Sequence, residues 1–133
     1  MSAVVLDTHA AVWYFLGSAR LSSTALLAIE AAINAGEYIY LPSISIIEVI
    51  YLVEKGRLPE AALERLEASL ADPDSLIVIA VLDLGVAQKV RKISKADVPD
   101  MPDRIIAATA LHLGLPLITR DTMIQASIVP TIW

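Results

Sequence analysis

Short, uniformly apolar runs recur along this chain, and each is followed by a segment with helical character. The runs that predict strands are Val4–Leu6, Tyr38–Leu41, Leu76–Ile79 and Leu115–Thr119. A last edge strand is expected within residues 129–133, despite Pro130. Strands that are apolar on both faces must be covered on both faces, and parallel strands need crossover helices to connect them. The pattern therefore predicts an α/β protein, a three-layer α/β/α sandwich with a short, mostly parallel sheet.

Capping residues indicate where the intervening helices begin and end. The expected helices cover residues 10–16, a segment from Ser22–Thr24 to Ala35, residues 44–55, a segment that restarts at Pro59, residues 84–94 and residues 103–113. Gly36, Gly56 and Gly114 follow three of them, where a helix commonly ends on a left-handed residue. After Arg120 and Asp121 we expect only a short turn. The helices at 10–16 and 26–35 carry almost no charge, so their faces are expected at interfaces.

The composition fits one globular domain, residues 1–133. Hydrophobic residues make up 56% of the chain and charged residues 19%, which excludes a disordered protein. The formal net charge of -5 argues against a general polyanion binder with a broad basic face. Without cysteine there is no disulfide and no thiolate metal site. No signal peptide and no apolar stretch of about 18 residues is found, so we expect a soluble, cytoplasmic protein without a membrane span.

Acidic residues stand where two of the predicted strands end. Asp7 directly follows the first strand, and Asp121 follows the run that ends at Thr119. Because ligands of open α/β sheets bind beyond the carboxyl ends of the strands, both acids are candidate site residues. Each alone is equally an ordinary N-cap or Asx-turn residue, so the structural interpretation stays open at this point.

Glu48 is the only charged residue in the apolar segment Ile46–Ile50. An unpaired ionised carboxylate in such surroundings costs several kcal/mol. A bound cation or a hydrogen-bond donor explains it better than a solvated strip beside Ser45 and Tyr51, which is the alternative.

Asp100 and Asp103 open the helix at 103–113, with Pro102 in its first turn. Helix capping explains Asp100 well and leaves the role of Asp103 open. This helix is expected to bring its N-terminus to the sheet edge that carries Asp7 and Asp121. Four acids, Asp7, Glu48, Asp103 and Asp121, are therefore predicted to converge.

Converging carboxylates need a counter-charge. Two of them about 5 Å apart repel by roughly 3 kcal/mol at an effective dielectric constant of about 20. All-oxygen ligands favour Mg²⁺ or Mn²⁺ over zinc, and such a site suits metal-assisted phosphoryl chemistry.

The basic residues give weaker signals. His9 is a candidate for a hydrogen bond to the Asp7 carboxylate or to a substrate, and a structural role is the alternative. His112 is assigned no role. The cluster between Lys89 and Lys95 is expected to be a solvated face. Arg104 and Arg120 adjoin the proposed acids and are the candidates for contacting a nucleic-acid phosphate or holding a carboxylate.

Four ordered motifs of the chain resemble a PIN domain. They are Leu6–Trp13, the helix 43–53 that contains Glu48, the segment Asp100–Ala108, and Leu117–Asp121. With the final Pro130-x-x-Trp133, their order and spacing are most similar to VapC-type toxins of toxin–antitoxin pairs. The resemblance implies a Mg²⁺- or Mn²⁺-dependent endoribonuclease that cleaves RNA by metal-activated water. It also implies a five-stranded parallel sheet, a homodimer and inhibition by a small VapB-like antitoxin.

The resemblance also implies roles for individual residues. It makes Asp7, Glu48, Asp103 and Asp121 the catalytic and metal-binding acids, the same four that the strand ends and the buried charge select. Thr119 matches a polar position beside the last acid, where it would orient that carboxylate. Asp100 matches an acid that is common in this group, and Thr8 is a further secondary candidate.

Other classes of protein share parts of this pattern. A haloacid-dehalogenase-like phosphatase also begins with an apolar strand and an Asp, but it needs a second Asp where this chain has His9. A receiver-like domain needs an acidic pair near the first strand and a Lys after a late strand, and neither is present. A non-catalytic module whose acidic pocket binds a basic peptide would bind divalent metal without cleaving RNA.

Overall fold

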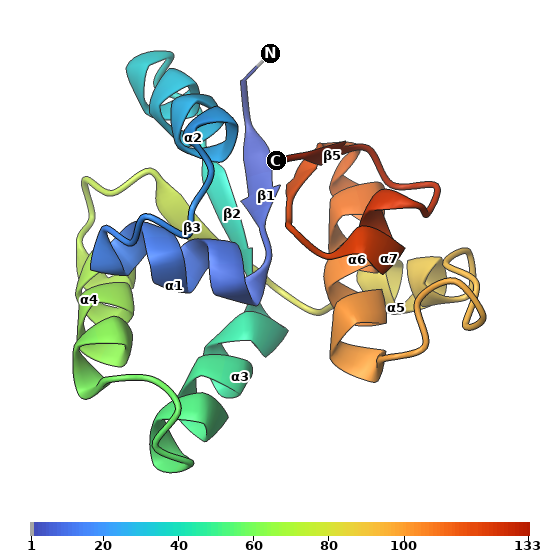
Figure 1. The fold of residues 1–133 in the computed structure, drawn as a ribbon. Coiled ribbons are helices and arrows are strands. Elements are labelled where there is room, and N and C mark those ends of the chain that lie inside the picture. The colour runs from blue at the N-terminus through green and yellow to red at the C-terminus, as the bar shows by residue number, and fades with distance from the viewer. Residues whose placement is uncertain (1) are drawn as a thin grey trace.

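The computed structural model describes residues 2–133, in which one or two helices connect each strand to the next (Figure 1). The strands are β1 (Val4–Leu6), β2 (Ile39–Pro42), β3 (Ile77–Ala80), β4 (Leu117–Ile118) and β5 (Thr131–Ile132). The helices are α1 (Thr8–Leu16), α2 (Ser23–Asn34), α3 (Ser43–Glu54), α4 (Glu60–Ala71), α5 (Leu84–Val90), α6 (Met101–Leu113) and α7 (Thr122–Gln125).

The strands form one five-stranded sheet in the order β3-β2-β1-β4-β5. Every neighbouring pair is parallel, and Val5 of the central strand pairs with Tyr40 on one side and Leu117 on the other. The predicted α/β class is confirmed, and the sheet of residues 2–133 is wholly parallel. The chain builds β1, β2 and β3 outward in one direction and then returns to place β4 on the other side of β1. In α/β sheets a ligand crevice forms at such a reversal.

The sheet is covered on both faces, which explains why its strands are apolar throughout. Val4 and Leu6 of β1 face a core that includes Ile29 of α2 and Leu66 of α4. Val5, between them, faces a second core built mainly from α5, α6 and α7. Figure 1 shows these two groups of helices on opposite sides of the strands. The central strand is therefore buried on both faces, as the alternation of side chains along a strand requires.

Three segments differ from the sequence-based expectation. The helix expected over 84–94 ends at Val90, and the strand expected over 115–119 spans only Leu117–Ile118. That strand starts late because the amide of Leu115 still bonds to the Ala110 carbonyl at the end of α6. The turn expected after Asp121 is a short helix, α7, which Asp121 caps. The edge strand expected within 129–133 is confirmed as β5.

The two helices that carry almost no charge differ in exposure. In α1 the residues from Ala10 to Trp13 are buried, and only the half-buried Tyr14, Phe15 and Leu16 leave apolar surface for the expected interface. In α2, by contrast, Leu27 is 64% exposed, and Leu26 and Ile33 are also exposed. In the part of the chain that the structure describes, no helix has the length and apolarity needed to cross a membrane.

Candidate active site

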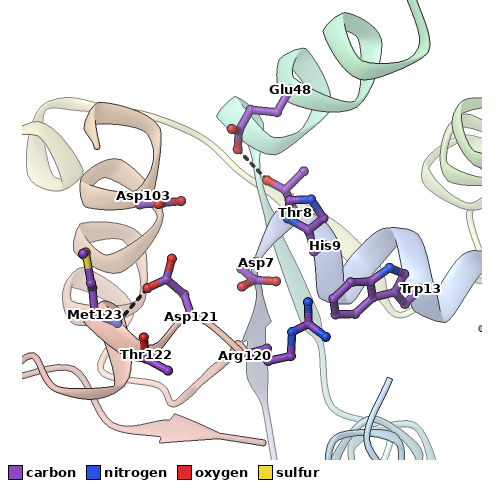
Figure 2. Close-up of a pocket in the computed structure, with 10 residues that line it drawn as sticks. All are labelled: Asp7, Thr8, His9, Trp13, Glu48, Asp103, Arg120, Asp121, Thr122 and Met123. Carbon is purple, nitrogen blue, oxygen red and sulfur yellow. Dashed lines mark hydrogen bonds between the residues drawn. The ribbon is translucent and has the colours of Figure 1, made fainter. Parts of the chain in front are cut away.

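A pocket of about 450 Å³ lies at the carboxyl ends of β1 and β4 (Figure 2). Its lining consists of Asp7, Thr8, His9, Trp13, Glu48, Asp103, Arg120, Asp121, Thr122 and Met123. All four predicted acids are among these residues. Asp7 follows β1, and Glu48 lies in α3. Asp103 lies in the first turn of α6, and Asp121 directly precedes α7. The convergence that the strand ends predicted is therefore present in the fold.

Asp7 is both a helix cap and a pocket residue. Its Oδ1 accepts a 2.8 Å hydrogen bond from the amide of Ala10, which caps α1, and the side chain is only 9% exposed. Burial raises the pKa of Asp7 above its usual value, and the charge of Asp121 adds to the rise. Hydrogen bonds from the Thr119 hydroxyl and the Ala10 amide, and the charge of His9, oppose it. Asp7 therefore caps α1 from a position that also faces the pocket.

Asp121 combines the same two roles at the other side of the pocket. Its Oδ1 accepts hydrogen bonds from the amides of Met123 at 2.9 Å and Ile124 at 3.1 Å, which starts α7. Thr119 lies beneath it, fully buried, and its hydroxyl accepts the amide of Asp121 at 3.0 Å. Thr119 thus fixes the backbone of Asp121 through its hydroxyl.

Glu48 has a hydrogen-bond donor. The Thr8 hydroxyl donates to Glu48 Oε1 at 2.6 Å, and Thr8 Oγ1 lies 3.0 Å from Ser45 Oγ. Thr8 and Ser45 are both buried. Ser45 and Glu48 are three residues apart in α3, a spacing that puts both on the side of the helix that meets Thr8. From the sequence, a bound cation or a hydrogen-bond donor is expected to explain the charge of Glu48. The structure supplies the donor, which is the hydroxyl of Thr8.

Asp103, like Asp7, has a raised pKa. Its pKa is raised from 3.8 to about 7, first by burial and then by the charges of Asp100, Asp121 and Glu48. A hydrogen bond between the Asp100 and Asp103 carboxyls adds to the rise, because it favours the protonated form. The negative charges of the pocket are thus close enough together to make ionisation of Asp103 difficult.

Asp100 is explained by capping. Its carboxylate accepts the amide of Asp103 at 3.1 Å as the N-cap of α6, the side chain is exposed, and the pocket lining does not include it. Asp100 affects the pocket because its negative charge raises the pKa of Asp103.

The four carboxylates stand around the pocket rather than at a single point. Figure 2 shows Asp103 and Asp121 at the left, Glu48 at the top and Asp7 near the centre of the view. Within residues 2–133 no three acidic or histidine side chains are arranged closely enough to hold a metal ion as they stand. The donors are nevertheless the hard oxygen ligands that Mg²⁺ and Mn²⁺ prefer, and the raised pKa of Asp7 and Asp103 shows that their charge is not balanced. The donor chemistry fits a hard divalent cation.

Arg104 does not belong to this site. Its guanidinium donates to the carbonyl of Ile93 at 2.9 and 3.2 Å and to that of Val90 at 3.0 Å, where α5 ends. The structure therefore does not bring Arg104 to the acids beside which the sequence analysis placed it. Successive residues on a helix point about 100° apart, so adjacency to Asp103 in sequence turns Arg104 away from the pocket.

Arg120 does line the pocket, and it lies against an aromatic group that the sequence did not single out. The guanidinium carbon is 4.7 Å from the centre of the Trp13 ring. The rings of His9 and Trp133 lie 5.6 Å and 5.8 Å from Trp13. Trp13 and Trp133 both stood in quoted motifs, but nothing in the sequence showed that they pack together.

Comparison with known proteins agrees with this fold of a parallel sheet flanked by helices. Residues 4–127 match the PIN domain family, and the chain belongs to that family. It is 30% identical to Ribonuclease VapC22 of Mycobacterium tuberculosis, over all of both chains. The predicted resemblance to VapC-type PIN domains is confirmed, and no comparison favours the haloacid-dehalogenase or receiver alternatives.

Solved structures share the fold. VapBC2 from Rickettsia felis, bound to a DNA fragment from its promoter, has a TM-score of 0.72 at 15% identity, covering 97% of this chain and 96% of that chain. A toxin–antitoxin complex from Klebsiella pneumoniae has a TM-score of 0.65 at 21% identity, covering 98% of this chain and 96% of that chain. At these identities the likeness is one of fold.

Proposed function

We propose that this chain, as a single domain, is a metal-dependent endoribonuclease and the toxin of a toxin–antitoxin pair in the cytoplasm. The observation that carries the proposal is the gathering of Asp7, Glu48, Asp103 and Asp121 around one pocket, with the pKa of Asp103 raised to about 7 by burial and by neighbouring charges. Perturbed carboxyl groups in a cleft are typical of functional sites. Similarity to Ribonuclease VapC22 supports RNA as the substrate.

We propose that the same four carboxylates hold Mg²⁺ or Mn²⁺. A bound divalent cation supplies activation of water and stabilisation of the charge that develops on the leaving oxygen. Three of the acids are fixed by hydrogen bonds before any ion arrives: Asp7 by Ala10, Glu48 by Thr8 and Asp121 by the amides of α7. Such partners of metal ligands set the direction of the ligand oxygens.

The partners we propose are a second copy of this chain and a small VapB-like antitoxin. One of the structures that share the fold is a toxin–antitoxin complex. The exposed apolar side chains of α2 suit a protein interface. The acidic pocket attracts a Lys or Arg side chain of the antitoxin, which would compete with a cation for the carboxylates. Co-purification of a small neighbouring gene product that suppresses cleavage, together with the mass of the chain in solution, tests both partners.

The decisive experiment compares two capping aspartates. Asp7 caps α1 inside the pocket, whereas Asp83 caps α5 through the amide of Val86 and does not line the pocket. New RNA ends are sequenced after brief expression of wild type, Asp7→Asn and Asp83→Asn. We expect ends with wild type and Asp83→Asn but not with Asp7→Asn, and cleavage by the purified chain that stops in EDTA. Cleavage that survives both Asp7→Asn and EDTA would contradict the proposal.

A further inference from the structure

We propose that Arg120, held against Trp13, binds a phosphate group of the RNA strand beside the acidic part of the pocket. This inference rests on the nuclease function proposed above and names the residue that grips the substrate. It starts from a contrast within the pocket: Figure 2 shows Arg120, Trp13 and His9 on the opposite side of Asp7 from Asp103 and Asp121.

The indole ring of Trp13 supports the guanidinium of Arg120. The guanidinium carbon lies 4.7 Å from the centre of the Trp13 ring, within the range in which a cation is attracted to an aromatic face. Trp13 is itself only 7% exposed and packs against the rings of His9 and Trp133. A guanidinium stacked on a fixed ring keeps the N–H groups at its edge free, and this edge matches the oxygens of a phosphate.

The backbone on both sides of Arg120 is fixed as well. The amide of Thr119 bonds to the Ile132 carbonyl at 3.2 Å, and the amide of Asp121 bonds to the Thr119 hydroxyl at 3.0 Å. Asp121 then caps α7. The Arg120 side chain is exposed, so it projects from a rigid strand end into the open pocket. Little conformational freedom remains to be lost when a ligand arrives.

Arg120 is also the single Lys or Arg among the described residues that line the pocket. Neutralising the acids would be the alternative role for such a cation. The contact that the structure gives the guanidinium of Arg120 is with the ring of Trp13, at 4.7 Å from the ring centre, which leaves its charge available to a ligand. Because the acids repel a polyanion, a cation at the edge of the pocket is what an RNA strand needs in order to approach them.

Binding is measured by fluorescence anisotropy with a fluorescein-labelled oligouridylate in Mg²⁺. The full chain carries Asp103→Asn throughout, so that the probe is not cut. We expect Arg120→Gln to raise Kd about tenfold, as loss of one charge-assisted hydrogen-bonded contact does. The slope of log Kd against log salt concentration should fall by about 0.7, the value for one phosphate contact on a single strand. Arg120→Lys should keep the slope while weakening binding less.

Two further variants sharpen the comparison. Arg57→Gln removes an exposed arginine that does not line the pocket, and should change neither Kd nor slope. Trp13→Leu removes the support, so the effect of Arg120→Gln should shrink in that background. In chains with Asp103 intact, Arg120→Gln should raise KM more than it lowers kcat.

The outcomes separate this inference from the proposed function. If the parent chain neither binds nor cuts RNA, the proposed function fails and this inference fails with it. If the parent chain binds and cuts but Arg120→Gln keeps the same Kd and salt slope, only the role of Arg120 is overturned. A lower melting temperature of Arg120→Gln in EDTA, with unchanged Kd, would identify Arg120 as the neutralising cation instead.

Discussion

The hydroxyl of Thr8 donates a 2.6 Å hydrogen bond to Oε1 of Glu48, and so connects the first turn of α1 to α3. Hydrogen bonds to an ionised acceptor are short and about twice as strong as neutral ones. This bond lets a carboxylate remain in a helix whose neighbouring residues are apolar. It also fixes one wall of the pocket relative to Asp7, the residue directly before Thr8.

Thr8→Val should therefore lower kcat for RNA cleavage by about tenfold or more, because a hydrogen bond to a charged group is lost and Glu48 is no longer held. Thr8→Ser keeps the hydroxyl and should retain most of the activity. Thr109→Val is the matched control, since this buried threonine bonds only to the Ile105 carbonyl outside the pocket. Equal kcat for Thr8→Val and wild type would remove Thr8 from the site.

Replacing the acids by their amides should separate activity from stability. Asp7→Asn and Asp103→Asn should abolish cleavage while leaving the metal-free protein as stable as wild type or more so, because each removes repulsion. Asn still caps a helix, whereas Asp7→Ala should cost about 1 kcal/mol through loss of the bond to Ala10. Melting in EDTA checks this, and clear destabilisation by both amide variants would show that the acids are structural.

The metal-free protein should lose stability as the pH rises from about 4 to about 7. The pKa of Asp103 is 3.8 when unperturbed and about 7 in the folded chain, and that of Asp7 is also raised. Over this interval the folded state binds more protons than the unfolded state, so the free energy of unfolding falls with increasing pH. Melting temperatures in EDTA at several pH values should show a decline of a few degrees, and a shallower one for Asp103→Asn. An identical pH profile for the two proteins would contradict the raised pKa.

Divalent metal should reverse this loss. Mg²⁺ should raise the melting temperature of wild type, because a ligand that binds only the folded state stabilises it. The rise should be larger at pH 8 than at pH 6, since Asp103 must lose its proton to bind a cation. Calorimetric titration with Mg²⁺ provides an independent check, and Asp83→Asn should bind as wild type does. If Mg²⁺ raised the melting temperature of Asp103→Asn as much as that of wild type, the ion would bind elsewhere.

Arg104 should be important for stability and not for catalysis. Arg104→Met removes hydrogen bonds to the carbonyls of Val90 and Ile93, which should cost about 1–3 kcal/mol of unfolding free energy. Denaturant unfolding measures that cost. Below its melting temperature the variant should cut RNA with a kcat close to that of wild type, unlike Arg120→Gln, whose KM rises.

The sequence was sufficient to predict the sheet and the position of the acids. Apolar runs identify strands that are buried on both faces, and a residue that follows such a strand lies at the carboxyl edge whatever the details of packing. Asp7 and Asp121 are therefore placed by topology alone. Glu48 stood out because a charge in an apolar helix needs a partner.

The partners of these residues could not be predicted. Thr8 and Glu48 are 40 residues apart, and nothing local links them. The direction of Arg104 depends on where α5 ends, and the short helix α7 has too few residues to show a period. The packing of Trp13 against Trp133 joins distant parts of the chain within one core. These contacts are tertiary, and they depend on how segments far apart in the sequence meet.

The reversal of strand order between β1 and β4 divides the acids between two halves of the chain. Asp7 and Glu48 belong to the half that is synthesised first, and Asp103 and Asp121 belong to the half that follows. A nascent chain on the ribosome therefore cannot assemble the pocket until Asp121 has left the exit tunnel and β4 has paired with β1. Under the proposed function, the first half of the chain alone is therefore inactive, because it carries only two of the four acids.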